Sequence, residues 1–191
     1  MRIIFIILLC VKNSYALDVF IEPGLFVDMF NTETVNYNDG TNEYSGVLRN
    51  KSLSYAMKFG VHYHKWEFGL DSEVYSLVAH FKGEGSQEDF SKEVHVTYNS
   101  LFVGYEFYPK NIIYLSISDT PYLTSGTESY TEHASVFSME YSYHLKQWVS
   151  VNVKIETAAK LEDKSSSTHK TFEYRDLILV GFSFPLSTAD H

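Results

Sequence analysis

The sequence has only one cysteine, few basic residues and no apolar run long enough to cross a bilayer as a helix. The longest apolar run, residues 3–11, falls well short of the roughly 20 residues that a membrane-spanning helix needs. Cys10 lies in that run, so disulfides cannot hold the folded domain together. Acidic residues outnumber basic ones by 24 to 15, a net charge of −9, which argues against nucleic acid as a partner. After Ala16 no stretch shows sustained helical periodicity.

The first sixteen residues follow the pattern of a cleaved signal peptide. A positive start at Arg2 precedes the apolar run, and the small residues Ser14 and Ala16 stand where a signal peptidase needs them. We therefore expect residues 1–16 to be removed on export. Residues 17–186 would form the folded domain, and residues 187–191 a short C-terminal extension.

Alternation of apolar and polar residues recurs about eight times after Ala16, which predicts β-strands. In one of these segments Phe59, Val61 and Tyr63 alternate with Gly60 and His62. The face that carries the apolar residues has no charge in any of the segments, whereas the opposite face collects glycines, serines and charged residues. The predicted strands lie near residues 18–30, 53–64, 66–77, 95–107, 112–119, 134–145, 148–158 and 172–186.

The connections between the predicted strands alternate between short and long. Short turns, such as the one at Lys65, fall at one end of the strands, and long polar loops such as residues 31–50 fall at the other. Aromatic residues mark the short-turn end of the uncharged face and predict an aromatic girdle at a membrane interface. This girdle consists of Tyr63, Trp66, Phe107, Tyr143 and Trp148.

These features resemble the small eight-stranded outer-membrane β-barrels of Gram-negative bacteria, which have short periplasmic turns, long external loops and an apolar outer band. The segment "GFSFPL" fits the end of the last strand in that family, with Gly181, Phe184 and Leu186 as the assembly signal. The resemblance implies an all-β, eight-stranded antiparallel up-and-down transmembrane barrel. It also implies contact with outer-membrane lipid, recognition by the barrel-insertion machinery, a monomer and no cofactor.

The inward face of such a barrel must bring its charges together, because an unpaired buried charge is very costly. We expect a packed polar lumen, either as a salt-bridged core that fixes the strand register or as a lumen that binds protons or cations. The residues predicted for this lumen network are Glu22, Lys58, His62, Asp71, Glu106, Glu140, Lys154, Glu156 and Arg175.

The function that this pattern favours is a structural or surface-binding barrel, with long external loops for a protein or glycan ligand and no porin-sized pore. One alternative is a lipid A-modifying acyl hydrolase or transferase that uses the segment "EHAS", with His133 and Ser135 as weak catalytic candidates. The other is a soluble periplasmic barrel of the lipocalin kind, in which the same alternation is turned outside in. No spacing of residues indicates a metal site.

Overall fold

The computed structural model describes residues 18–29, 33–39, 42–50, 53–82, 88–118, 122–125, 128–131, 136–157, 159–162, 171–174 and 177–187. The predicted signal peptide, residues 1–16, and residues 188–191 of the predicted C-terminal extension lie outside these ranges. Within them, no helix has the length and apolar character needed to span a membrane.

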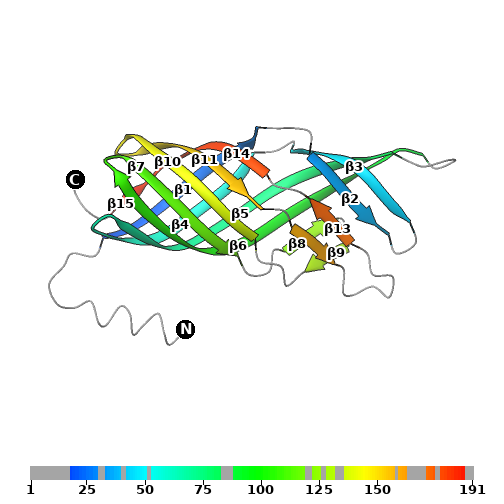
Figure 1. Cartoon of the computed structure of the whole chain (residues 1–191), viewed down its shortest axis with the longest axis horizontal. Coiled ribbons are helices and arrows are strands. Elements are labelled where there is room, and N and C mark those ends of the chain that lie inside the picture. Colours follow the sequence, from blue (N-terminus) through cyan, green and yellow to red (C-terminus); the bar gives the residue numbers. More distant parts are fainter. Residues whose placement is uncertain are drawn as a thin grey trace, which may run out of the picture.

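Eight antiparallel strands close into a barrel, as Figure 1 shows. They are β1 (Asp18–Asp28), β4 (Ser54–Tyr63), β5 (Trp66–Phe81), β6 (Phe90–Tyr108), β7 (Asn111–Ser118), β10 (Val136–Lys146), β11 (Val149–Glu156) and β14 (Leu177–Ser183). Each barrel strand pairs with the next one along the chain, and β14 pairs with β1 to close the circle. The short β15 (Leu186–Ser187) also pairs with β1. The predicted fold class is confirmed.

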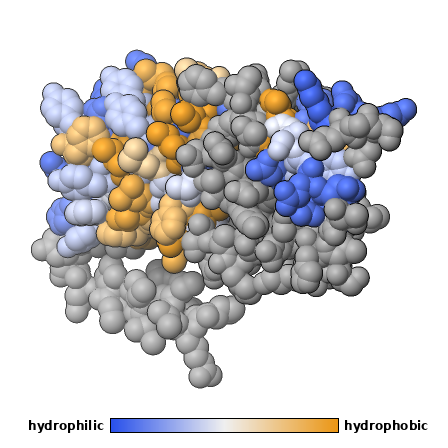
Figure 2. Space-filling view, turned by 45° about the vertical axis from the view of Figure 1, so that its right-hand side comes forward, coloured by the Kyte–Doolittle hydropathy of each residue, from blue (hydrophilic) through white to orange (hydrophobic). Residues whose placement is uncertain are grey.

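The charged face of the strands lines the interior, and the uncharged face points outwards. On β4, Ala56 and Lys58 are buried, whereas Tyr55 and Phe59 are 58% and 46% exposed. Figure 2 shows the result as a hydrophobic band across the visible face of the barrel, beside a hydrophilic end. A continuous apolar exterior of this kind requires lipid around it, so the soluble lipocalin-like alternative is wrong.

Glycines make room for large inward rings in the narrow lumen. A Cβ atom added to Gly60 would lie 2.7 Å from the ring of Phe20, and one added to Gly104 would lie 2.6 Å from the ring of Tyr114. Both distances are too short for a real contact. An aromatic ring therefore takes the space that a side chain at each of these glycines would need.

Tight turns join the strands at one end of the barrel. His64 and Lys110 adopt positive φ angles of 56° and 70° in the turns from β4 to β5 and from β6 to β7. Gln147 and Trp148 form the turn from β10 to β11. Asp18 at the start of β1 belongs to this same end, because it pairs with His62 beside the β4–β5 turn, and so does Ser187 in β15, which pairs with Phe20.

The other end extends into a second tier of strands, most of which the sequence pattern did not predict. We call this tier the external sheet; it runs in the order β12–β13–β2–β3–β5–β6–β8–β9, with β5 and β6 shared with the barrel. The added strands are β2 (Glu33–Asn38), β3 (Glu43–Asn50), β8 (Tyr122–Ser125), β9 (Glu128–Thr131), β12 (Ala159–Glu162) and β13 (Thr171–Tyr174). The sequence analysis expected long loops at these segments, because most of the runs are short and polar; the exception is β13, most of which lies in the predicted strand 172–186.

The interior is layered along the barrel axis. Phe20, Phe102, Ile112 and Tyr114 form an apolar cluster near the tight turns. A larger apolar cluster fills the opposite half and continues into the external sheet. Charged side chains lie between the two, as β1 illustrates: its inward positions run from Phe20 through Glu22 to Phe26.

Candidate functional site

A buried ion pair crosses the lumen between β4 and β10. These strands stand on opposite sides of the barrel, because three strands separate them in either direction around it. Lys58 Nζ lies 2.6 Å from Glu140 Oε1, and both side chains are 2% exposed. The ammonium group also lies 4.7 Å from the centre of the Tyr114 ring, a cation–π contact. This pair therefore connects opposite walls of the barrel.

A second group of ion pairs crosses the lumen between β11 and β5, which are also opposite strands. Lys154 Nζ lies 3.3 Å from Asp71 Oδ2, pairs closely with Glu73 Oε1, and lies 3.5 Å from Glu156 Oε1. The Tyr98 hydroxyl, from β6, is hydrogen-bonded to carboxylate oxygens of both Glu73 and Glu156. One lysine and one tyrosine thus hold three buried acids together.

Other acids in the lumen are held by hydrogen bonds. Ser183 Oγ donates to Glu22 Oε1, and the Tyr114 hydroxyl donates to Glu67 Oε2 at 2.7 Å. His62 Nδ1 lies 3.3 Å from Glu67 Oε1. The polar side chains that make these contacts, with those of the two ion-paired groups, occupy the middle of the barrel and are joined by hydrogen bonds and ion pairs. We call these residues the lumen network: Glu22, Lys58, His62, Glu67, Asp71, Glu73, Tyr98, Tyr114, Glu140, Lys154, Glu156 and Ser183.

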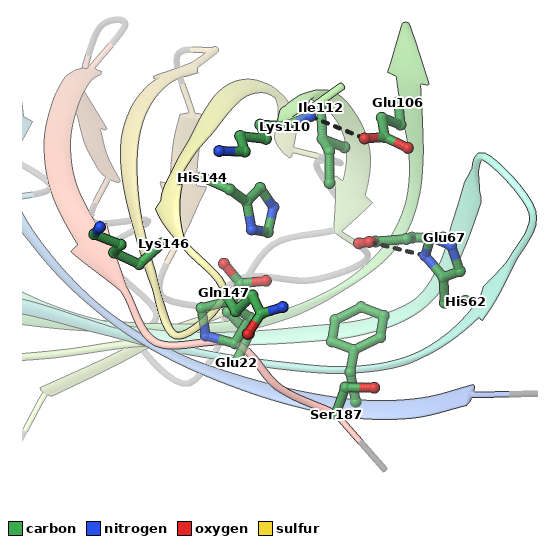
Figure 3. A pocket seen from close by; sticks show the side chains of 12 residues that line it. Glu22, His62, Glu67, Glu106, Lys110, Ile112, His144, Lys146, Gln147 and Ser187 are labelled. Carbon is green, nitrogen blue, oxygen red and sulfur yellow. Dashed lines mark hydrogen bonds and ion pairs between the residues drawn. The ribbon is translucent and has the colours of Figure 1, made fainter. Parts of the chain in front are cut away.

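A cavity of about 330 Å³ lies below the lumen network at the tight-turn end (Figure 3). His144 points into this space, and Glu22, Glu67 and Phe20 belong to its lining. At its rim, Glu106 Oε1 accepts a hydrogen bond of 2.9 Å from the Lys110 backbone N–H. The cavity therefore reaches the lumen network from the tight-turn end, at Glu22 and Glu67. In the described ranges, no three His, Cys, Asp or Glu side chains are grouped as a metal site.

The structure brings most of the predicted lumen residues together. Glu22, Lys58, Asp71, Glu140, Lys154 and Glu156 are buried in the lumen network. His62 belongs to the lumen network but also lines the cavity, as Glu106 does, and both are partly exposed. Arg175 and the catalytic candidates His133 and Ser135 fall outside the described residues. The prediction omitted the Tyr98 and Tyr114 hydroxyls, although both residues are in phase with the inward face of their strands.

The predicted girdle residues point outwards near the tight turns. Their exposed fractions range from 40% to 61%, and the ring centres of Trp66 and Tyr105 lie 4.6 Å apart. Of the predicted assembly signal, Gly181 is buried against Phe26, whereas Phe184 and Leu186 are exposed. The residues of the girdle are Tyr63, Trp66, Phe107, Tyr143 and Trp148.

An aromatic cluster lies in the external sheet, where β2 and β3 meet the β5–β6 hairpin. The rings of Phe81 and Phe90 stack at 5.0 Å, and Tyr44 meets Phe90 edge-on at 5.1 Å. Tyr37 packs against Phe81, with 5.6 Å between the two ring centres. On the outer face of the same hairpin, His80 Nδ1 is hydrogen-bonded to Ser91 Oγ at 2.6 Å. These side chains come from segments that the sequence analysis treated largely as loops.

In fold, the chain is similar to solved outer-membrane proteins, among them OprG and AlkL. OprG from Pseudomonas aeruginosa matches 90% of this chain and 96% of its own, with a TM-score of 0.52 and 13% identity. AlkL, solved in lipid bilayers, matches 94% of this chain and 98% of its own, also with a TM-score of 0.52 and 13% identity. At this identity the likeness concerns the fold alone. No protein-family model matches the sequence, and no curated protein matches it.

The closed barrel, its apolar exterior and this likeness together define the class of the protein. It is an eight-stranded β-barrel of the outer-membrane type, the kind found in Gram-negative bacteria. The apolar band lies where barrels of this type contact lipid, and the external sheet extends beyond that band.

Proposed function

We propose that this protein is a non-enzymatic surface-binding barrel of the outer membrane, with a lumen closed to the passage of solutes. In this proposal the barrel is a rigid support, and the external sheet is the part that meets a ligand. The observation that carries the proposal is the lumen network, whose two groups of ion pairs join opposite walls of the barrel. An eight-stranded barrel has room for side chains or one small ligand, and here side chains occupy the middle of the lumen.

Two features of the external sheet support a binding role. Its strands extend β5 and β6 beyond the barrel, so that segments between the barrel strands are held in hydrogen-bonded register. An apolar cluster fills its interior, with Val35, Ala79 and Val94 completely buried. A preorganised surface loses less conformational entropy on binding than flexible loops do. Rigidity of this kind suits recognition at the cell surface.

Planar-bilayer recording tests the closed lumen. Residues 17–191, refolded and inserted into a lipid bilayer, should give no large and stable conductance steps. The matched control is the variant Lys58→Ser with Glu140→Ser, which removes one cross-lumen ion pair and should admit more current than the wild type. Large, regular steps from the wild type would contradict the proposal and favour a porin.

A binding screen tests the role of the external sheet. The refolded protein in lipid nanodiscs is screened against envelope and host-surface components, beside a variant in which residues 31–52 are replaced by a short turn. We expect binding that the variant loses while its barrel remains folded. Equal binding by both proteins would show that β2 and β3 are not part of the binding surface, and would contradict the proposal.

A further inference from the structure

The inner end of the cavity at the tight turns is formed by two acids that have no lysine partner. Among the described residues, both lysines of the lumen network make their ion pairs with the other four acids of the network. Glu22 is instead hydrogen-bonded to Ser183. Glu67 contacts the Tyr114 hydroxyl and His62. Since Glu22 and Glu67 line the cavity, its inner end offers two carboxylates to a positively charged group.

A histidine ring points into the same space (Figure 3). His144 Nε2 is buried and has no hydrogen-bond partner in the part of the chain that the structure describes. Buried polar atoms nearly always have such a partner, so this nitrogen indicates that a ligand or a water molecule belongs in the cavity. Phe20 and Ile112 supply apolar wall. The volume of about 330 Å³ is that of a site for a small ligand.

The rim of the cavity carries the opposite charge to its inner end. Lys110 and Lys146 line the rim with one acid, Glu106, so positive charge is in excess there by two to one. The Lys110 carbonyl accepts a hydrogen bond of 2.9 Å from the His144 backbone N–H, which holds the β6–β7 turn beside His144. A ligand in this cavity would therefore meet negative charge at the inner end and positive charge at the rim.

The strand register sets the distance between the two ends. Glu67 pairs with Gly104, and Glu106 lies two residues nearer to the turn on the same face of β6. Because a strand rises 3.2–3.4 Å per residue, these two levels are roughly 7 Å apart. One extended amino-acid residue spans at most about 3.6 Å, and two span about 7 Å. The separation of charges in the cavity thus matches the two ends of a dipeptide.

We propose that this cavity binds a small zwitterion of dipeptide length. Its ammonium group would lie at Glu22 and Glu67, and its carboxylate at Lys110. The peptide group between them would lie beside His144 and give Nε2 a hydrogen-bond partner. In barrels of the outer-membrane type the short turns face the periplasm, so the ligand would enter from there. The site lies at the opposite end from the external sheet, and it goes beyond the proposed surface-binding function.

Isothermal titration calorimetry with alanyl-alanine tests the proposal. Refolded residues 17–191 are held in nanodiscs, which leave both ends of the barrel open to water. We expect alanyl-alanine to bind, and its N-acetylated form to bind at least about tenfold more weakly, because the buried carboxylates lose a charged partner. The C-amidated form should bind about fivefold more weakly, since it loses an ion pair at the exposed rim. Free alanine, which cannot reach both ends, should also bind more weakly.

A variant of the rim locates the carboxylate. Lys110 has a φ of 70°, and asparagine tolerates this conformation, so Lys110→Asn keeps the turn while it removes the charge. This variant should bind alanyl-alanine about fivefold more weakly and the C-amidated form as the wild type does. The matched control is Lys65→Asn, which removes an exposed lysine from the β4–β5 turn. Lys65 does not line the cavity, so this control should bind both peptides as the wild type does.

Three results would overturn the proposal: no binding of alanyl-alanine by the wild type, equal binding of a blocked form and the free dipeptide, or full affinity in Lys110→Asn. In each variant, the difference in gel mobility between boiled and unboiled protein shows whether the barrel has folded. None of these results bears on the closed lumen or on binding by the external sheet, which the bilayer recording and the binding screen test separately.

Discussion

The two lysines of the lumen network depend on acidic partners across the barrel. Lys58 and Glu140 are both 2% exposed and lie 2.6 Å apart, so each neutralises a charge that water cannot reach. A buried pair need not stabilise the fold more than an apolar pair of the same size would. Removing only one partner is different, because it leaves the other charge buried and uncompensated.

We therefore predict that Lys58→Met lowers the free energy of unfolding by about 3–5 kcal/mol. The double variant Lys58→Met with Glu140→Gln should recover most of this loss, because no isolated charge then remains in the lumen. Urea unfolding in lipid vesicles, followed by the fluorescence of Trp66 and Trp148, measures both changes. A single variant as stable as the wild type would show that this ion pair is not buried as described.

At the scale of the strand, the outward positions meet lipid over a defined height. The outward side chains of β5 run from Trp66 in the girdle to Val74, with Leu70 midway between them. Leu70 is 49% exposed, and its cross-strand neighbours are Phe59 and Leu101. This position therefore lies near the middle of the apolar band.

We predict that Leu70→Arg lowers the free energy of unfolding by about 2–4 kcal/mol, because it places a charge near the bilayer midplane. Phe107→Arg is the matched control: it lies in the girdle near the end of β6, and the substitution should cost about 0–1 kcal/mol. Urea titration in vesicles of one lipid measures both variants. Equal costs at the two positions would contradict the depth that we assign to β5.

The barrel strands were predictable because alternation of apolar and polar residues over many positions can be recognised in one segment, without knowing which other strands pair with it. Most of the external strands were not, because runs such as β2 are short and polar and gain their stability only from pairing with neighbouring strands. Val35 and Tyr37 look isolated in the sequence, but they enter the apolar cluster once β2 pairs with β3.

The sequence analysis placed the lumen residues on the inward face, but it could not pair them. Lys154 meets Glu73, and Lys58 meets Glu140, across the barrel, about eighty positions apart in the sequence. Such contacts depend on strand register and on which walls are opposite. The Tyr98 hydroxyl was missed for the same reason, since its partners Glu73 and Glu156 come from β5 and β11.

At the scale of the whole molecule, one chain combines three environments. An apolar exterior faces lipid, a lumen network joins opposite walls, and an external sheet with its own apolar interior extends beyond the band. These environments are consistent with one another only if the charged face of the strands lies inside a closed barrel in a membrane. The account depends on this single orientation of the strands.

Gel mobility with and without boiling tests that orientation most directly. Residues 17–191 are refolded into detergent or lipid vesicles, and each sample is divided before electrophoresis. A closed membrane barrel should need the detergent or lipid to fold, and its unboiled band should migrate differently from the boiled, unfolded chain. A protein that is soluble and folded without detergent, and whose band does not change on boiling, would contradict the account.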